Sequence, residues 1–137
     1  MTSSAGYSST ALDLGGVISL FREESRALAL YVLGSAATGR MRADSDVDLA
    51  FVCEPGQHLS GIEILDLATE SSLRIGRTVD LGAVDSHNLV YAYQVFSTGW
   101  LLFARDVTRA EMLRSTLLGM YAAFNVERRE VLDAYRA

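Results

Sequence analysis

Residues 33–49 of the chain read LGSAATGRMRADSDVDL and connect the end of one apolar run to the start of the next. The apolar run Ala27–Leu33 ends at Gly34 and Ser35, which small residues follow. This pattern predicts a buried strand that breaks into a tight turn and the start of a helix. Glycine lets an anionic group approach the backbone N–H groups of such a turn closely. The turn is therefore a candidate phosphate-binding site.

Carboxylates follow this turn at a fixed distance. Ten residues separate Ser35 from Asp46, and Asp46 and Asp48 stand at i and i+2 around the start of a second apolar segment, Val47–Cys53. On a strand, this spacing puts both carboxylates on one face, about 6–7 Å apart at the backbone. Asp80 lies in a third apolar run, 78–84, where an unpaired carboxylate is costly unless it binds a metal or another partner. If the second and third strands are neighbours, three carboxylates converge.

Three converging carboxylates suit phosphoryl and nucleotidyl transfer. Such reactions gain most of their rate from positioning and charge neutralisation, and two Mg²⁺ ions can stabilise both the attacking and the leaving oxygens. Magnesium prefers oxygen ligands. Asp46, Asp48 and Asp80, together with nucleotide phosphates, would form a minimal ligand set for such a pair of ions.

The remaining segments predict an α/β domain. Val17, Leu20, Phe21 and Leu28 recur at helical spacing, and a second periodic segment runs from Ile62 toward Gly76. Further along, Asp85 and Ser86 offer caps for a helix that stops at Gly99, and a short strand covers 100–103. We expect a flexible tail at 1–10 and one domain at 11–137.

A final helix is predicted over 106–135. It could span about 45 Å at ~1.5 Å per residue, which is long for so small a domain. Its apolar positions repeat every three or four residues and continue to Val131, Leu132 and Tyr135. We expect another chain to cover part of this stripe.

Composition excludes several classes of function. The 137 residues carry 12 basic and 17 acidic side chains, a net charge of −5, so direct nucleic-acid binding is not expected. The lone Cys53 and two histidines offer neither a disulfide nor a plausible zinc cluster. The sequence has no leader pattern and no apolar stretch of membrane-spanning length. We therefore expect a cytoplasmic protein without a membrane partner.

The joint pattern resembles the signature of the DNA polymerase β-like nucleotidyltransferase superfamily. It consists of Gly34-Ser35, ten residues, and then Asp46-Val47-Asp48, with Gly39 and Ser45 between. The short chain, the later Thr78-Val79-Asp80-Leu81 and the stretch before the terminal helix are similar to the minimal nucleotidyltransferases. These are the antitoxin halves of HEPN/MNT toxin–antitoxin pairs.

This resemblance implies a small mixed sheet flanked by helices, use of ATP and Mg²⁺, and transfer of AMP onto a tyrosine of a HEPN ribonuclease toxin. Asp46 and Asp48 would bind both metal ions, while Asp80 would complete the metal site and assist the attacking hydroxyl. The nucleotide would be held by Gly34, Ser35, Gly39 and Arg40. The position before Gly39 is often basic in this family but is Thr38 here, so Arg40 or Arg42 would supply the charge.

Two alternatives remain open at this level. The chain could be an antitoxin with a vestigial site that acts by binding alone, in which case it would consume no ATP with its partner. It could also modify a small molecule such as an aminoglycoside, although its length leaves little room for an additional substrate-binding domain. A neighbouring reading frame for a helical, HEPN-like protein would favour the antitoxin.

Overall fold

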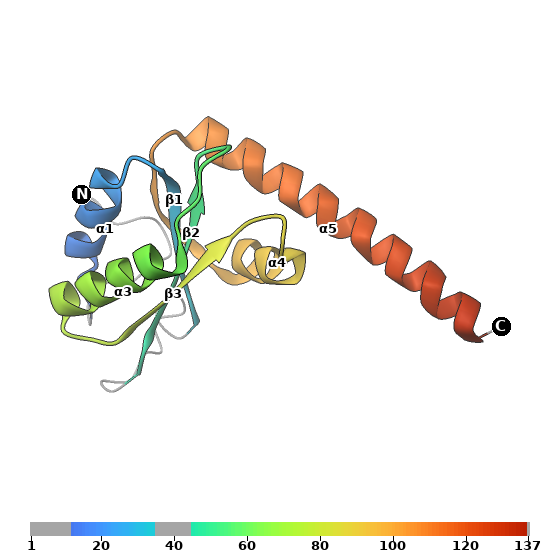
Figure 1. Cartoon of the computed structure of the whole chain (residues 1–137), viewed down its shortest axis with the longest axis horizontal. Helices are drawn as coiled ribbons and strands as arrows, with labels where there is room; N and C mark the ends of the chain where they lie inside the picture. Colours follow the sequence, from blue (N-terminus) through green and yellow to red (C-terminus); the bar gives the residue numbers. More distant parts are fainter. Residues whose placement is uncertain (1–11, 35–44, 137) are drawn as a thin grey trace.

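The computed structural model describes residues 12–34 and 45–136 (Figure 1). In chain order its elements are α1 (Gly15–Glu23), β1 (Ala27–Leu33), β2 (Val47–Cys53), α3 (Gly61–Ile75), β3 (Val79–Val84), α4 (Leu89–Thr98), β4 (Trp100–Ala104) and α5 (Val107–Arg136). These elements confirm the predicted α/β class and the long C-terminal helix. The predicted tail at 1–10 and the helix start after Ser35 lie outside the described residues.

The four strands form one mixed sheet in the order β3-β2-β1-β4. β1 runs antiparallel to β2 and β4, whereas β2 and β3 are parallel. Every residue of β1 is buried, because this strand is central and helices cover both of its faces. The continuous apolar run of β1 follows from that position. Leu28 belongs to this strand and not to the first helix, which corrects its assignment by helical spacing.

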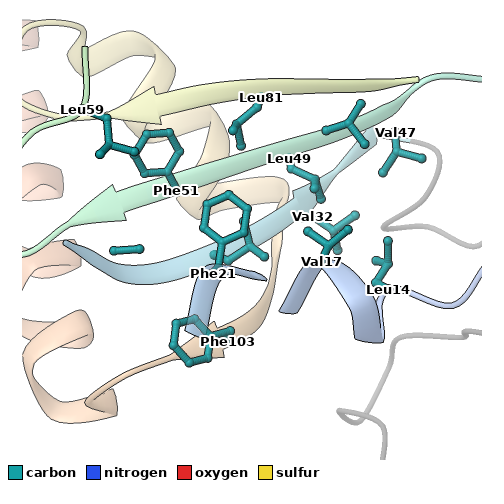
Figure 2. Close-up of a cluster of buried hydrophobic side chains, with 13 residues drawn as sticks. Leu14, Val17, Phe21, Val32, Val47, Leu49, Phe51, Leu59, Leu81 and Phe103 are labelled. Atoms are coloured by element: carbon teal, nitrogen blue, oxygen red, sulfur yellow. The ribbon is translucent and has the colours of Figure 1, made fainter. Parts of the chain in front are cut away.

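Helices α1 and α3 cover one face of the sheet. Figure 2 shows Val17 and Phe21 of α1 among side chains of the strands, including Leu49 and Leu81. The Phe21 ring lies 5.9 Å from that of Phe51, centroid to centroid. This apolar layer draws alternate residues of β2 and β3 inward, so the intervening residues of these strands point to the other face.

Helix α4 and the first part of α5 cover the second face. Tyr31 of β1 meets Phe96 of α4 edge to face, with ring centroids 5.5 Å apart. Ala92 and Leu117 are buried in the same cluster. The domain therefore has three layers, with the sheet between two pairs of helices (Figure 1). No helix in the described parts of the chain is long and apolar enough to cross a membrane.

The start of α4 differs from the prediction. Asn88, not Asp85 or Ser86, caps this helix, because the Asn88 side chain accepts a hydrogen bond of 3.1 Å from the backbone N–H of Tyr91. Asp85 instead accepts from the N–H of His87 at 2.8 Å and closes the turn after β3. The helix consequently begins at Leu89.

The second half of α5 extends beyond the rest of the domain (Figure 1). Leu117 is its last buried residue, whereas Val131, Leu132 and Tyr135 are 55%, 46% and 86% exposed. The rest of the described chain therefore leaves most of the predicted apolar stripe uncovered.

Candidate active site

Gly34, directly after β1, lies close to an acidic side chain of β2. Leu33 is the register partner of Asp48, and Gly34 follows with φ +66°, a left-handed conformation that favours glycine. A Cβ atom on Gly34 would lie 2.9 Å from Oδ2 of Asp48. Glycine is required here both for the backbone conformation and for the close approach of the turn to the carboxylate.

The predicted neighbouring strands bring two carboxylates together. β2 and β3 pair in parallel with Asp48 opposite Asp80. Both side chains are exposed, near the amino ends of their strands, on the face that α4 covers. Asp46 lies just before β2, two residues from Asp48, and is also exposed. The structure thus confirms that the second and third strands are neighbours. The roles of the three side chains stay predictions.

The surroundings of Asp80 differ from the expectation. The sequence suggested a carboxylate made costly by an apolar environment, but Asp80 is exposed while its neighbours Val79 and Leu81 are buried. The strand alternates, so the core takes the flanking side chains and leaves Asp80 on the open part of the opposite face. The cost of burying this carboxylate is therefore no argument for a bound metal.

Three hydrogen bonds hold the amino ends of the strands that carry these residues. The N–H of Val79 donates to Ser72 Oγ on α3 at 2.9 Å, and the N–H of Val47 donates to the Thr78 carbonyl at 2.8 Å. The guanidinium of Arg77 also donates to the carbonyl of Ser45 at 2.7 Å. Together these contacts tie the amino ends of β2 and β3 to each other and to α3.

The electrostatics of the site suit a bound cation. Asp48 is partly shielded from solvent, which raises the pKa of its carboxyl, and the negative charges of Asp80 and Asp46 raise it further. Among residues 12–34 and 45–136, no three acidic, histidine or cysteine side chains form a compact metal-binding group. Mg²⁺ commonly takes one or two carboxylates and fills its other positions with water and substrate phosphates. The carboxylate oxygens of Asp48 and its acidic neighbours fit that requirement.

An open cavity of about 740 Å³ lies over these carboxylates, a volume within the range of small-molecule sites. Gly34, Asp48 and Asp80 line the sheet side. The helix side is lined by polar residues that sequence reasoning did not single out for the site, Asn88, Gln94 and Thr98, and by Tyr91.

Tyr91 is half-buried and lines the cavity. Burial raises the pKa of its hydroxyl, and the charges of Asp80 and Asp48 add to this effect. The spacing of Asn88, Tyr91 and Gln94, each three residues from the next, was the available sequence signal, because it puts them on one helix face.

The other predicted nucleotide-binding residues, Ser35, Gly39 and Arg40, lie outside the described residues, as does Arg42. Of the predicted phosphate-binding turn, the structure therefore describes Gly34 alone.

Solved structures similar to this chain include chains from toxin–antitoxin complexes. A crystal structure of a toxin–antitoxin with AMP-PNP contains a chain of 25% identity that superposes with a TM-score of 0.76, covering 92% of this chain and 100% of that one. A chain of an MntA–HepT toxin–antitoxin has 24% identity and a TM-score of 0.68, covering 88% of this chain and 94% of that one. A chain from a complex of tri-AMPylated Shewanella oneidensis HEPN toxin with MNT antitoxin has 24% identity and a TM-score of 0.67, covering 88% of this chain and 93% of that one.

No curated protein sequence matches the chain. A family model described as polymerase beta nucleotidyltransferase matches residues 16–108, from α1 to the first turn of α5. This match contains the turn at Gly34, the three aspartates and the whole sheet. The chain belongs to the polymerase β nucleotidyltransferase family.

Proposed function

We propose that this chain is an antitoxin that transfers AMP from ATP, with Mg²⁺, onto a tyrosine of a cognate HEPN-type ribonuclease toxin. The observation that carries the proposal is the meeting of Gly34, Asp48 and Asp80 in one cavity of a nucleotidyltransferase fold. The toxin as acceptor is supported by the similar structures, one of which is a complex with AMP-PNP and another a complex with a tri-AMPylated HEPN toxin.

Each end of the site has a proposed role. The turn at Gly34 and Ser35, with Gly39 and Arg40, binds the phosphates of ATP. Asp46, Asp48 and Asp80 hold Mg²⁺, which would neutralise phosphate charge when bound.

The acceptor tyrosine enters beside Asp80. Its phenolic oxygen forms a bond to the α-phosphorus of ATP. The bond between that phosphorus and the oxygen that bridges the α- and β-phosphates breaks, and pyrophosphate leaves with that oxygen. Asp80 accepts the phenolic proton.

We further expect the reaction to take place in the cytoplasm. The sequence has a single cysteine, Cys53, and therefore forms no internal disulfide, as is usual for proteins of the reducing cytosol.

The direct test is transfer of label from ATP. We expect the chain, incubated with Mg²⁺, its cognate HEPN-type toxin and ATP labelled at the α-phosphate, to label a tyrosine of that toxin. ATP labelled at the γ-phosphate is the control and should transfer nothing, because pyrophosphate leaves. A complex that inactivates the toxin while no label moves would instead identify an antitoxin that acts by binding alone.

We also expect the exposed stripe of α5 to contact the toxin. Changing Leu132 and Tyr135 to glutamate should weaken toxin binding at least about tenfold, because such apolar anchors carry much of the energy of an interface. The domain should stay folded, since both side chains are largely exposed.

The matched control for the α5 variant replaces Ile62 and Leu73 on α3, which are also exposed, with glutamate. Calorimetry with the purified toxin measures both affinities. Binding of the folded α5 variant at wild-type strength would move the interface elsewhere.

A further inference from the structure

The hydroxyl end of the Tyr91 ring lies against Gly82 of β3. A Cβ atom on Gly82 would collide with the Tyr91 hydroxyl and would lie 2.8 Å from ring carbon Cζ and 3.1 Å from Cε2. The φ of Gly82 is not in the left-handed region. Glycine is therefore needed here for space alone, and the space admits one aromatic side chain.

This contact brings the Tyr91 hydroxyl beside the predicted acceptor end of the site. Gly82 follows Asp80 by two residues on β3, so the two share one face of the sheet. Tyr91, Gly82 and Asp80 line the same cavity. Within the described part of the chain, the Tyr91 hydroxyl forms no hydrogen bond, which leaves it able to donate one to a molecule in the cavity.

The order of the strands separates the two ends of the cavity. Gly34 follows β1, Asp48 is on β2, and Asp80 and Gly82 are on β3. Neighbouring strands lie about 4.8 Å apart, so the turn at Gly34 and the Tyr91 hydroxyl are separated by roughly two strand spacings. If the phosphates bind at the turn, the β3 side of the cavity, where Tyr91 lies, stays open to the attacking group.

We propose that Tyr91 is a substrate-contacting residue on the acceptor side of the cavity. Its hydroxyl donates a hydrogen bond to the phenolic oxygen of the incoming tyrosine, next to Asp80. This inference rests on the proposed AMP transfer and adds to it the residue that orients the acceptor. The phenolic oxygen gives its proton to Asp80 and accepts the bond from Tyr91, which stabilises negative charge as it develops.

Tyr91→Phe is the first test, because it removes the hydroxyl and keeps the ring against Gly82. The turnover number for AMP transfer should fall about 3- to 10-fold, as expected for one hydrogen bond between neutral groups. The dissociation constant for ATP and the melting temperature should not change. Tyr93→Phe is the matched control, since the ring of Tyr93 stacks on Tyr121 at 4.4 Å and does not line the cavity.

A double-mutant cycle tests the contact itself. Gly82→Ala should lower transfer at least as much as Tyr91→Phe, because the added methyl group displaces the ring. In the Tyr91→Ala background the same change should have no further effect, since the space is already empty. An equal loss in both backgrounds would show that Gly82 acts without Tyr91.

Failure of this inference can be told from failure of the proposed function. Equal labelling of the toxin by wild type and Tyr91→Phe would overturn the role of Tyr91 and leave AMP transfer intact. Label on Tyr91 itself, in reactions without toxin, would also overturn the proposed role, because Tyr91 would then be an acceptor of AMP. If the wild-type chain labels no toxin at all, the proposed function fails and this inference fails with it.

Discussion

Replacing Asp46 and Asp48 together with asparagine is expected to abolish Mg²⁺-dependent binding of ATP, and AMP transfer with it. Asparagine keeps the shape of each side chain but removes the negative charge that attracts the cation. The turn at Gly34 would then face the phosphates without a neutralising ion. Calorimetric titration with ATP in the presence and absence of Mg²⁺ measures the effect.

The same variant should remain folded. Because the pKa of Asp48 is raised, its charged form is disfavoured in the native state. Ionisation of Asp48 therefore lowers the free energy of unfolding as the pH rises from the pKa of this carboxyl in the unfolded chain through its pKa in the folded chain. Asparagine cannot ionise, so the variant does not lose this free energy. Asp66→Asn with Asp133→Asn changes the same number of charges on α3 and α5 and should bind ATP normally. Unchanged Mg²⁺-dependent binding in the folded Asp46 and Asp48 variant would refute the assignment.

Asp80→Asn should instead separate chemistry from binding. Loss of a positioned base is expected to slow AMP transfer at least about 100-fold. ATP should still bind through the turn at Gly34 and the metal held by the other aspartates, and the toxin should still associate. A rate assay with labelled ATP, run beside affinity measurements for both ligands, tests all three expectations.

Asp85→Asn is the matched control for Asp80, because Asp85 directly follows β3 and its side chain accepts a hydrogen bond from the turn before α4. In cells, Asp80→Asn should fail to protect from the toxin if neutralisation requires AMP transfer. Full protection by a variant that transfers nothing would favour neutralisation by binding alone. Transfer at the wild-type rate would end the catalytic assignment of Asp80.

Local sequence patterns predicted the elements of the fold well. The first two strands have the predicted bounds, since each is an apolar run flanked by polar or turn-forming residues. The spacing of Asp46, Asp48 and Asp80 indicated that their carboxylates would meet if β2 and β3 were neighbours. That condition depends on strand pairing, which no local pattern could supply.

Contacts between distant segments account for most of what was missed. The exposure of Asp80 depends on how far α4 reaches over the second face of the sheet, and Tyr91 enters the site only when α4 is packed against Gly82. The cap of α4 was misassigned for a local reason, because Asp85, Ser86 and Asn88 all offer side-chain oxygens within four residues. Only the backbone geometry selects Asn88 among them.

The parallel register of β2 and β3 has a consequence for how activity is gained and lost. The alternation that buries Val47, Leu49 and Leu81 is the same alternation that exposes Asp48 beside Asp80. A slip of one residue would bury the carboxylates and expose the leucines, so a misregistered domain could not keep a working site. Catalytic competence and native core packing should therefore appear in a single cooperative step during refolding, and partly unfolded molecules should contribute no residual transfer.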